Sequence, residues 1–113
     1  MIFIKDGMHL SIARGDTGLL TVSCSGRIQE GSLFTLSVRR VEDGRVFLEK
    51  IVPQLTADSF FFEFSDVDTA LFAPGEYIYN ITQRGPGLVS TLVGQRFPND
   101  CHPKFYVMEA AGL

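Results

Sequence analysis

Hydrophobic and polar residues alternate in three short segments of the chain. Residues 33–41 read LFTLSVRRV, residues 59–64 read SFFFEF, and residues 19–24 read LLTVSC. Every second residue in these segments is apolar, a period that places one set of side chains on a core and the other in water. On a helix the same residues would be scattered around the axis. The pattern therefore predicts three β-strands, each with one buried face.

The alternation also assigns the two faces of these strands. The residues expected to point into the core are Leu20, Val22, Cys24, Phe34, Leu36, Val38, Phe60, Phe62 and Phe64. The residues expected to point outward are Thr21, Ser23, Thr35, Ser37, Arg39, Phe61 and Glu63. Tyr106 also points outward if Phe105 and Val107 are internal in a last strand. Phe61 and Tyr106 are thus candidate interface residues, although single exposed aromatic rings are also normal in proteins.

Turn residues separate the alternating segments. The sequence EDG at residues 42–44 suits a tight hairpin between Val41 and Arg45, and RGPG at residues 84–87 suits a second hairpin. About six to eight short strands joined by such turns are typical of an antiparallel sandwich or barrel. No internal repeat or linker composition interrupts the chain. We therefore expect a single domain over residues 1–113.

One segment, residues 65–75 (SDVDTALFAPG), does not alternate. Ser65 or Asp66 suits the N-cap of a helix, and the Pro-Gly pair at the end of the segment stops it. We expect one short helical turn near residues 66–72 that crosses from one sheet to the other. Residues 95–104 (QRFPNDCHPK) are expected to form an irregular loop before the last strand.

Residues 71–81 (LFAPGEYIYNI) have the spacing of a tyrosine corner, in which a tyrosine hydroxyl bonds back to the preceding crossover. Leu71, Pro74 and Tyr77 supply that spacing, with Gly75 in the turn. A buried phenol needs a hydrogen-bond partner, which the backbone of a crossover provides. The alternative is an ordinary Pro-Gly turn before an aromatic strand. With the corner, we expect an all-β, immunoglobulin-like or fibronectin-like antiparallel β-sandwich of about seven strands.

Charge and hydropathy limit the classes of partner. The formal net charge is −3, and the basic residues are scattered apart from Arg39-Arg40, so nucleic acid is not an expected partner. No apolar run approaches the roughly 18 to 20 residues that cross a bilayer, and Lys5 and Asp6 interrupt the apolar N-terminus. We therefore expect a soluble, unsecreted chain with no membrane partner.

The two cysteines, Cys24 and Cys101, are expected to be free thiols. A disulfide between them is the alternative, but the immunoglobulin pattern also includes a core Trp between the cysteines, and the sequence contains no Trp.

Two groups of residues suggest catalytic or metal chemistry. Residues 16–18 (DTG) have the order of an aspartic protease loop, but that chemistry needs two carboxylates that share a proton. Cys101 and His102 are adjacent, so on an extended chain they point to opposite sides. Asp100 adds a third metal-ligand type, yet zinc sites draw paired ligands from two places in a chain. We therefore expect no enzyme activity and no catalytic, cofactor-binding or metal-binding residues.

The tripeptide Arg14-Gly15-Asp16 suggests cell adhesion, which requires extracellular display on a projecting loop. Gly15 and Asp16 also have a local role, because Gly permits a positive φ and Asp hydrogen-bonds the backbone of its own turn. We interpret these residues as a turn.

Taken together, these motifs resemble a known family. The turn at residues 14–17, the central FTLSVRR strand and the Pro-Gly-x-Tyr-x-Tyr-x-Ile stretch from Pro74 to Ile81 are similar to the immunoglobulin-like N-terminal domain of phage baseplate upper proteins and related small phage tail proteins. The resemblance covers nearly the whole chain. It implies a structural module that binds further copies of itself or neighbouring tail proteins, forms a homo-oligomer or a mixed assembly, and needs no cofactor.

The resemblance also implies a location in the virion tail, or in the bacterial cytoplasm when a prophage is expressed. The alternative function is a free-standing immunoglobulin-like module that binds a carbohydrate or a partner on a bacterial surface. Because carbohydrate-binding modules often expose Trp platforms, the absence of Trp favours the assembly role.

Overall fold

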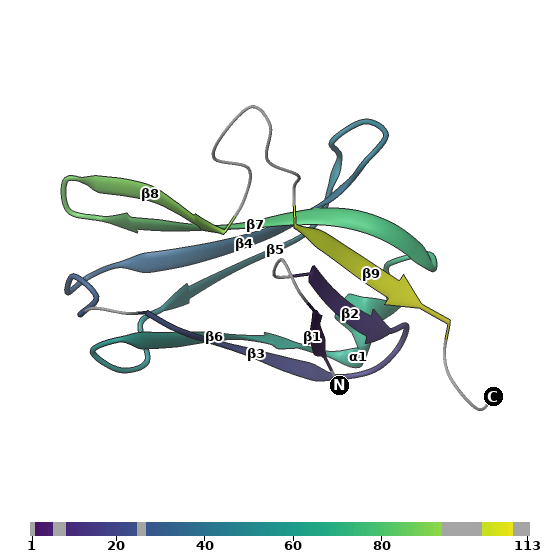
Figure 1. The fold of residues 1–113 in the computed structure, drawn as a ribbon, viewed down its shortest axis with the longest axis horizontal. Helices are drawn as coiled ribbons and strands as arrows, with labels where there is room; N and C mark the ends of the chain where they lie inside the picture. Colours follow the sequence, from purple (N-terminus) through teal and green to yellow (C-terminus); the bar gives the residue numbers. More distant parts are fainter. Residues whose placement is uncertain (1, 6–8, 25–26, 94–102, 110–113) are drawn as a thin grey trace.

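The computed structural model describes residues 2–5, 9–24, 27–93 and 103–109 (Figure 1). The elements follow in the order β1 (Phe3–Lys5), β2 (His9–Ala13), β3 (Gly18–Ser23), β4 (Leu33–Arg40), β5 (Val46–Pro53), β6 (Ser59–Phe64), α1 (Asp66–Ala70), β7 (Gly75–Gly85), β8 (Leu88–Val93) and β9 (Lys104–Met108). Within these ranges, no helix is long and apolar enough to cross a membrane.

The strands form two facing layers (Figure 1). The larger sheet has seven strands in the order β1-β2-β9-β7-β4-β5, with β8 paired to β7, and the smaller sheet consists of β3 and β6. The helix α1 follows β6 in the smaller sheet and leads into β7 in the larger one. The predicted all-β sandwich and its short helical crossover are therefore confirmed. Both predicted hairpins are also present, between β4 and β5 and between β7 and β8.

One pairing differs from the predicted antiparallel arrangement. Strands β2 and β9 run parallel, with Leu10 opposite Phe105 and Ile12 opposite Val107. The alternation has the same period in parallel and antiparallel strands, and no hairpin joins these two distant segments to fix their direction. The described part of the chain also holds nine strands rather than about seven. The three-residue strand β1 is too short to show an alternation.

Three phenylalanines of the smaller sheet form the centre of the core. Phe60, Phe62 and Phe64 are completely buried, as the alternation predicts. The ring of Phe60 stacks on that of Phe34 in the larger sheet, with centroids 3.7 Å apart. The inward residues of β3 follow the same pattern, since Leu20 is buried and Val22 packs against the core. Burial of these rings joins the two layers.

The outward face of β4 differs from the prediction at Ser37, which is only 7% exposed although the alternation places it in water. Strand β4 lies between β5 and β7, where Ser37 is paired with Glu49 on one side and Asn80 on the other. A small side chain in a central strand is covered by its longer neighbours. Thr35 on the same face is half-buried for the same reason.

We predict that Phe60→Ala lowers the free energy of unfolding by about 3 to 5 kcal/mol, because it leaves a cavity between the two sheets. Leu55→Ala is the control, since Leu55 is 59% exposed and should change stability by only about 0.5 kcal/mol. Denaturant unfolding monitored by circular dichroism measures both values. Equal losses in the two variants would contradict the assigned core.

Candidate functional site

The predicted tyrosine corner is present at the start of β7. The Tyr77 hydroxyl donates a hydrogen bond to the Ala73 carbonyl oxygen at 2.7 Å. The Tyr77 ring is buried and packs edge-on against Phe72, with centroids 4.8 Å apart, and is tilted against Phe47 at 5.6 Å. Gly75 begins the strand with a φ of 155°, a backbone conformation that L side chains rarely adopt. The corner thus fixes the path of the chain from the crossover into the larger sheet.

Leu71, which the sequence places in the spacing of the corner, lies at the surface. Leu71 is 60% exposed and serves as the C-cap of α1, whereas the next residue, Phe72, is completely buried. Pro74 is also exposed. The helix ends one residue before Leu71, so the turn that follows directs Phe72 into the core. The aromatic character of Phe72 was the signal in the sequence that could have identified it as the anchor.

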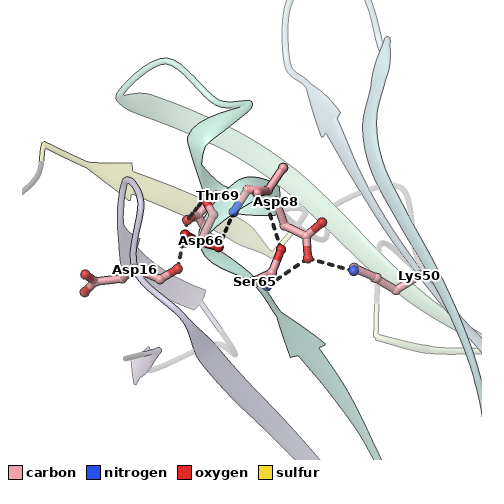
Figure 2. A network of polar contacts seen from close by, with 7 residues as sticks. Asp16, Lys50, Ser65, Asp66, Asp68 and Thr69 are labelled. Atoms are coloured by element: carbon pink, nitrogen blue, oxygen red, sulfur yellow. Dashed lines mark hydrogen bonds and ion pairs between the residues drawn. The ribbon is translucent and has the colours of Figure 1, made fainter.

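The turn at residues 14–17 packs on the helical crossover. Gly15 has a φ of 82°, and the Asp16 N–H donates to the Ala13 carbonyl at 3.1 Å, which confirms the predicted turn. The Thr69 hydroxyl donates to the Asp16 carbonyl oxygen at 2.8 Å (Figure 2). The Arg14 guanidinium also donates to the Ala70 carbonyl at 3.3 Å. The RGD tripeptide is therefore part of a contact between two segments of the fold.

The Asp-Thr-Gly stretch has a packing role at its last residue. A Cβ atom placed on Gly18 would lie 2.6 Å from Cγ1 of Ile2 and 3.1 Å from Cδ1 of Ile12. Glycine at this position lets the start of β3 approach these side chains closely. The Asp16 carboxylate points away from α1 and its acidic residues (Figure 2). The geometry around residues 16–18 is thus that of a packed turn and not of a carboxylate pair.

The N-terminus of α1 carries a capping box. The Asp68 N–H donates to the Ser65 hydroxyl at 3.1 Å, and the Ser65 N–H donates to the Asp68 carboxylate at 2.9 Å. Asp66 accepts a hydrogen bond from the Val67 N–H at 2.9 Å. Of the two predicted N-caps, Ser65 is the one observed. Two orphan N–H groups at the start of this short helix are therefore satisfied.

An ion pair links this cap to the larger sheet. Lys50 Nζ, on the inward side of β5, lies 2.7 Å from the Asp68 carboxylate (Figure 2). Partial burial favours a higher pKa for Asp68, but the hydrogen bonds from Lys50 and Ser65 outweigh it and lower the pKa below its usual value. The pair lines an open groove of about 520 Å³ beside Leu19 and Glu63. The pair therefore joins β5 to the start of α1 at this groove.

The remaining candidate residues are those with metal-binding or thiol chemistry. Among the described residues, no group of three or more His, Cys, Asp or Glu side chains is placed to hold a metal ion. Cys24 has a free, half-buried thiol whose pKa is raised by burial and by the nearby Asp58 carboxylate. The sequence trio at residues 100–102 lies outside the described residues, and so does most of the predicted loop at 95–104.

The two predicted interface aromatics lie on outward faces. Phe61 lies opposite Thr21 on the smaller sheet, and Tyr106 lies opposite Glu76 and Ser11 on the larger one. Both rings are half-buried rather than fully exposed, because neighbouring side chains cover part of each. Their role as interface residues remains a prediction.

The larger sheet carries an exposed apolar surface that the sequence analysis missed. Leu33, Ile51 and Val89 are exposed on its outward face, where Ile51 and Thr35 are paired and Arg84 lies between Leu33 and Val89. Together with Thr82 these residues line a groove of about 500 Å³, which we call the Ile51 face. Residues 46–53 (VFLEKIVP) do not alternate, so the outward position of Ile51 could be identified only once the register with β4 was known.

We predict that Tyr77→Phe lowers the free energy of unfolding by about 1 to 3 kcal/mol, because the Ala73 carbonyl oxygen loses its donor while the ring packing is kept. Tyr106→Phe is the matched control, since Tyr106 lies on an outward face. Chemical denaturation of both variants gives the two differences. An unchanged midpoint for Tyr77→Phe would refute the stabilising role of the corner.

The lowered pKa of Asp68 predicts an acid-sensitive contribution to stability. A carboxylate with a lower pKa in the folded chain stabilises the fold above its unfolded pKa of about 3.9, and that contribution disappears as the pH falls below this value. Asp68→Asn should lower the free energy of unfolding at pH 7 by about 1 kcal/mol. Between about pH 5 and pH 2, the stability of this variant should decrease less steeply than that of the wild type. Asp66→Asn, which changes the same charge in the same helical turn, should lose stability as steeply as the wild type does. Thermal unfolding across this pH range compares the two variants.

Comparisons of the chain with protein-family models, curated proteins and solved structures find no match.

Proposed function

We propose that the chain is a non-catalytic assembly module of a phage or prophage tail, which binds further copies of itself or neighbouring tail proteins. It would act in the virion tail, or in the bacterial cytoplasm before the tail assembles. The resemblance of the turn and Tyr77 motifs to the baseplate family suggests this role. The β-sandwich is compatible with it, because both of its sheets present an outward face.

The Ile51 face is the observation that carries the proposal. Ile51 is 59% exposed and Val89 is 72% exposed, and Leu33 lies between their strands. The three exposed apolar side chains lie on neighbouring strands, with Thr35, Thr82 and Arg84 among them. Exposed apolar side chains gathered on one face together with polar groups mark sites of protein association.

The charged residues of the Ile51 face suit a contact with another protein. Arg84 lies between Leu33 and Val89, and Glu49, two residues before Ile51, lies on the same face of β5. A second copy related by a two-fold axis can place these opposite charges against each other. Phe61, a candidate interface residue from the sequence, is half-buried on the smaller sheet and offers less exposed apolar area than Ile51 and Val89 do.

Immunogold electron microscopy tests the proposed location directly. An antibody against the chain would be applied to particles purified from an induced host lysate. Label at the tail supports the assembly role. Particles without label, together with free chain in the soluble fraction, would support the alternative of a free-standing binding module.

We predict that Ile51→Ser weakens self-association by about tenfold or more, because a polar group replaces one of the three exposed apolar side chains of this face. Leu55→Ser is a closely matched control, since Leu55 has the same exposure of 59% but lies in the turn between β5 and β6. Sedimentation velocity at several concentrations measures both. A strictly monomeric wild type, or an equal effect of the two variants, would contradict self-association through this face.

A further inference from the structure

A second groove lies at the other end of the same outward face. It has a volume of about 540 Å³ and is lined by His9, Gly75, Glu76, Tyr106, Val107, Met108 and Glu109. These residues meet because β9 lies between β2 and β7, so that Tyr106 is opposite Ser11 on one side and Glu76 on the other. We call this site the Tyr106 groove.

The floor of the groove is aromatic. The Tyr106 ring is half-buried, and its centroid lies 6.3 Å from that of the His9 ring at an interplanar angle of 58°. Within the described part of the chain, no hydrogen bond involves the Tyr106 hydroxyl. The site therefore combines an apolar ring surface with a phenol group that is available to a ligand.

The backbone fixes the hydrogen-bonding character of His9. Its Nδ1 accepts a hydrogen bond from the Lys104 N–H at 2.9 Å. In the neutral imidazole one ring nitrogen accepts and the other carries the proton, so the proton lies on Nε2. His9 therefore presents an N–H donor on the side of the ring away from the Lys104 backbone.

Carboxylates supply the acceptors of the groove. Glu76 pairs with Lys104 Nζ at 2.7 Å but has further lone pairs, because each carboxylate has about four acceptor positions. Glu109 is exposed at the rim. The two carboxylates disfavour an anionic ligand, and the charged rim disfavours a purely hydrocarbon one.

We propose that the Tyr106 groove binds a neutral saccharide. The apolar C–H face of a pyranose ring would stack on Tyr106, and its hydroxyl groups, which both donate and accept, would bond to His9 Nε2 and to the carboxylates of Glu76 and Glu109. This site goes beyond the assembly role. Along β7, Glu76 and Arg84 of the Ile51 face are separated by about 27 Å, given the rise of a β-strand.

The first test is a glycan array that carries neutral and sialylated oligosaccharides, probed with the full chain. The neutral sugars retained are then titrated by NMR. We expect binding of at least one neutral glycan, with amide shift changes concentrated at His9, Glu76, Tyr106 and Glu109. A preference for sialylated glycans, no binding at millimolar sugar, or shift changes centred elsewhere would overturn the proposal.

Two variants test whether Tyr106 and Glu109 belong to the saccharide site. Tyr106→Ser should weaken binding by about tenfold or more because it removes the stacking surface, and Glu109→Gln, at an exposed position, should weaken it without changing the fold. Phe61→Ser, which removes a half-buried ring from the other sheet, is the matched control and should bind as the wild type does. Circular dichroism checks that each variant is folded. Equal affinity of wild type, Tyr106→Ser and Glu109→Gln would refute the site.

The saccharide-binding test and the self-association test can succeed or fail independently of each other. Ile51→Ser should retain saccharide binding, and Tyr106→Ser should retain self-association. Loss of both properties in either variant would overturn the assignment of two separate surfaces.

Discussion

Burial of three phenylalanines against the larger sheet is the contact on which the rest of the structure depends. A two-stranded sheet is marginal in water by itself, so β3 and β6 persist only because Phe60, Phe62 and Phe64 are removed from solvent. The stack of Phe60 on Phe34 and the contact of Phe64 with Phe105 connect the smaller sheet to both central and late strands of the larger one. The smaller sheet is thus stable only when it packs against the larger one, which gives the sandwich.

The crossover at α1 connects the smaller sheet to the larger one along a path that its contacts fix. A five-residue helix has few internal hydrogen bonds, and its ends need partners from elsewhere. The capping box of Ser65 and Asp68 supplies them at one end, Lys50 ties that end to β5, and Thr69 fixes the turn at Asp16. The hydrogen bond from the Tyr77 hydroxyl to the Ala73 carbonyl oxygen then fixes the start of β7. The Ser65–Asp68 and Tyr77–Ala73 bonds fix the crossover locally, and the contacts of Thr69 with Asp16 and of Asp68 with Lys50 fix it to segments that are distant in sequence.

Periodicity, turn residues, capping preference and motif spacing predicted the parts of the fold that local chemistry determines. The faces of β6, the two hairpins, the Ser65 cap and the Tyr77 hydrogen bond each depend on residues within about ten positions of one another. The parallel pairing of β2 with β9, the cover over Ser37 and the exposure of the Ile51 face depend on which strands become neighbours. Leu71 shows the same limit at short range, because a shift of one residue at the end of α1 decides whether it or Phe72 enters the core.

Strand β7 explains how one sheet can carry two surfaces of different chemistry. It has eleven residues and pairs with β4 along most of its length, while its other edge pairs first with β9, through Gly75–Ile78, and then with β8, through Ile81–Gly85. The change of neighbour places aromatic and acidic side chains around Tyr106 at one end and aliphatic side chains around Arg84 at the other. Because a single continuous strand joins the two ends, their separation is held by the backbone of the sheet. A partner bound at the Ile51 face would therefore leave the Tyr106 groove open to solvent, and an assembled array of such modules would display one groove per copy.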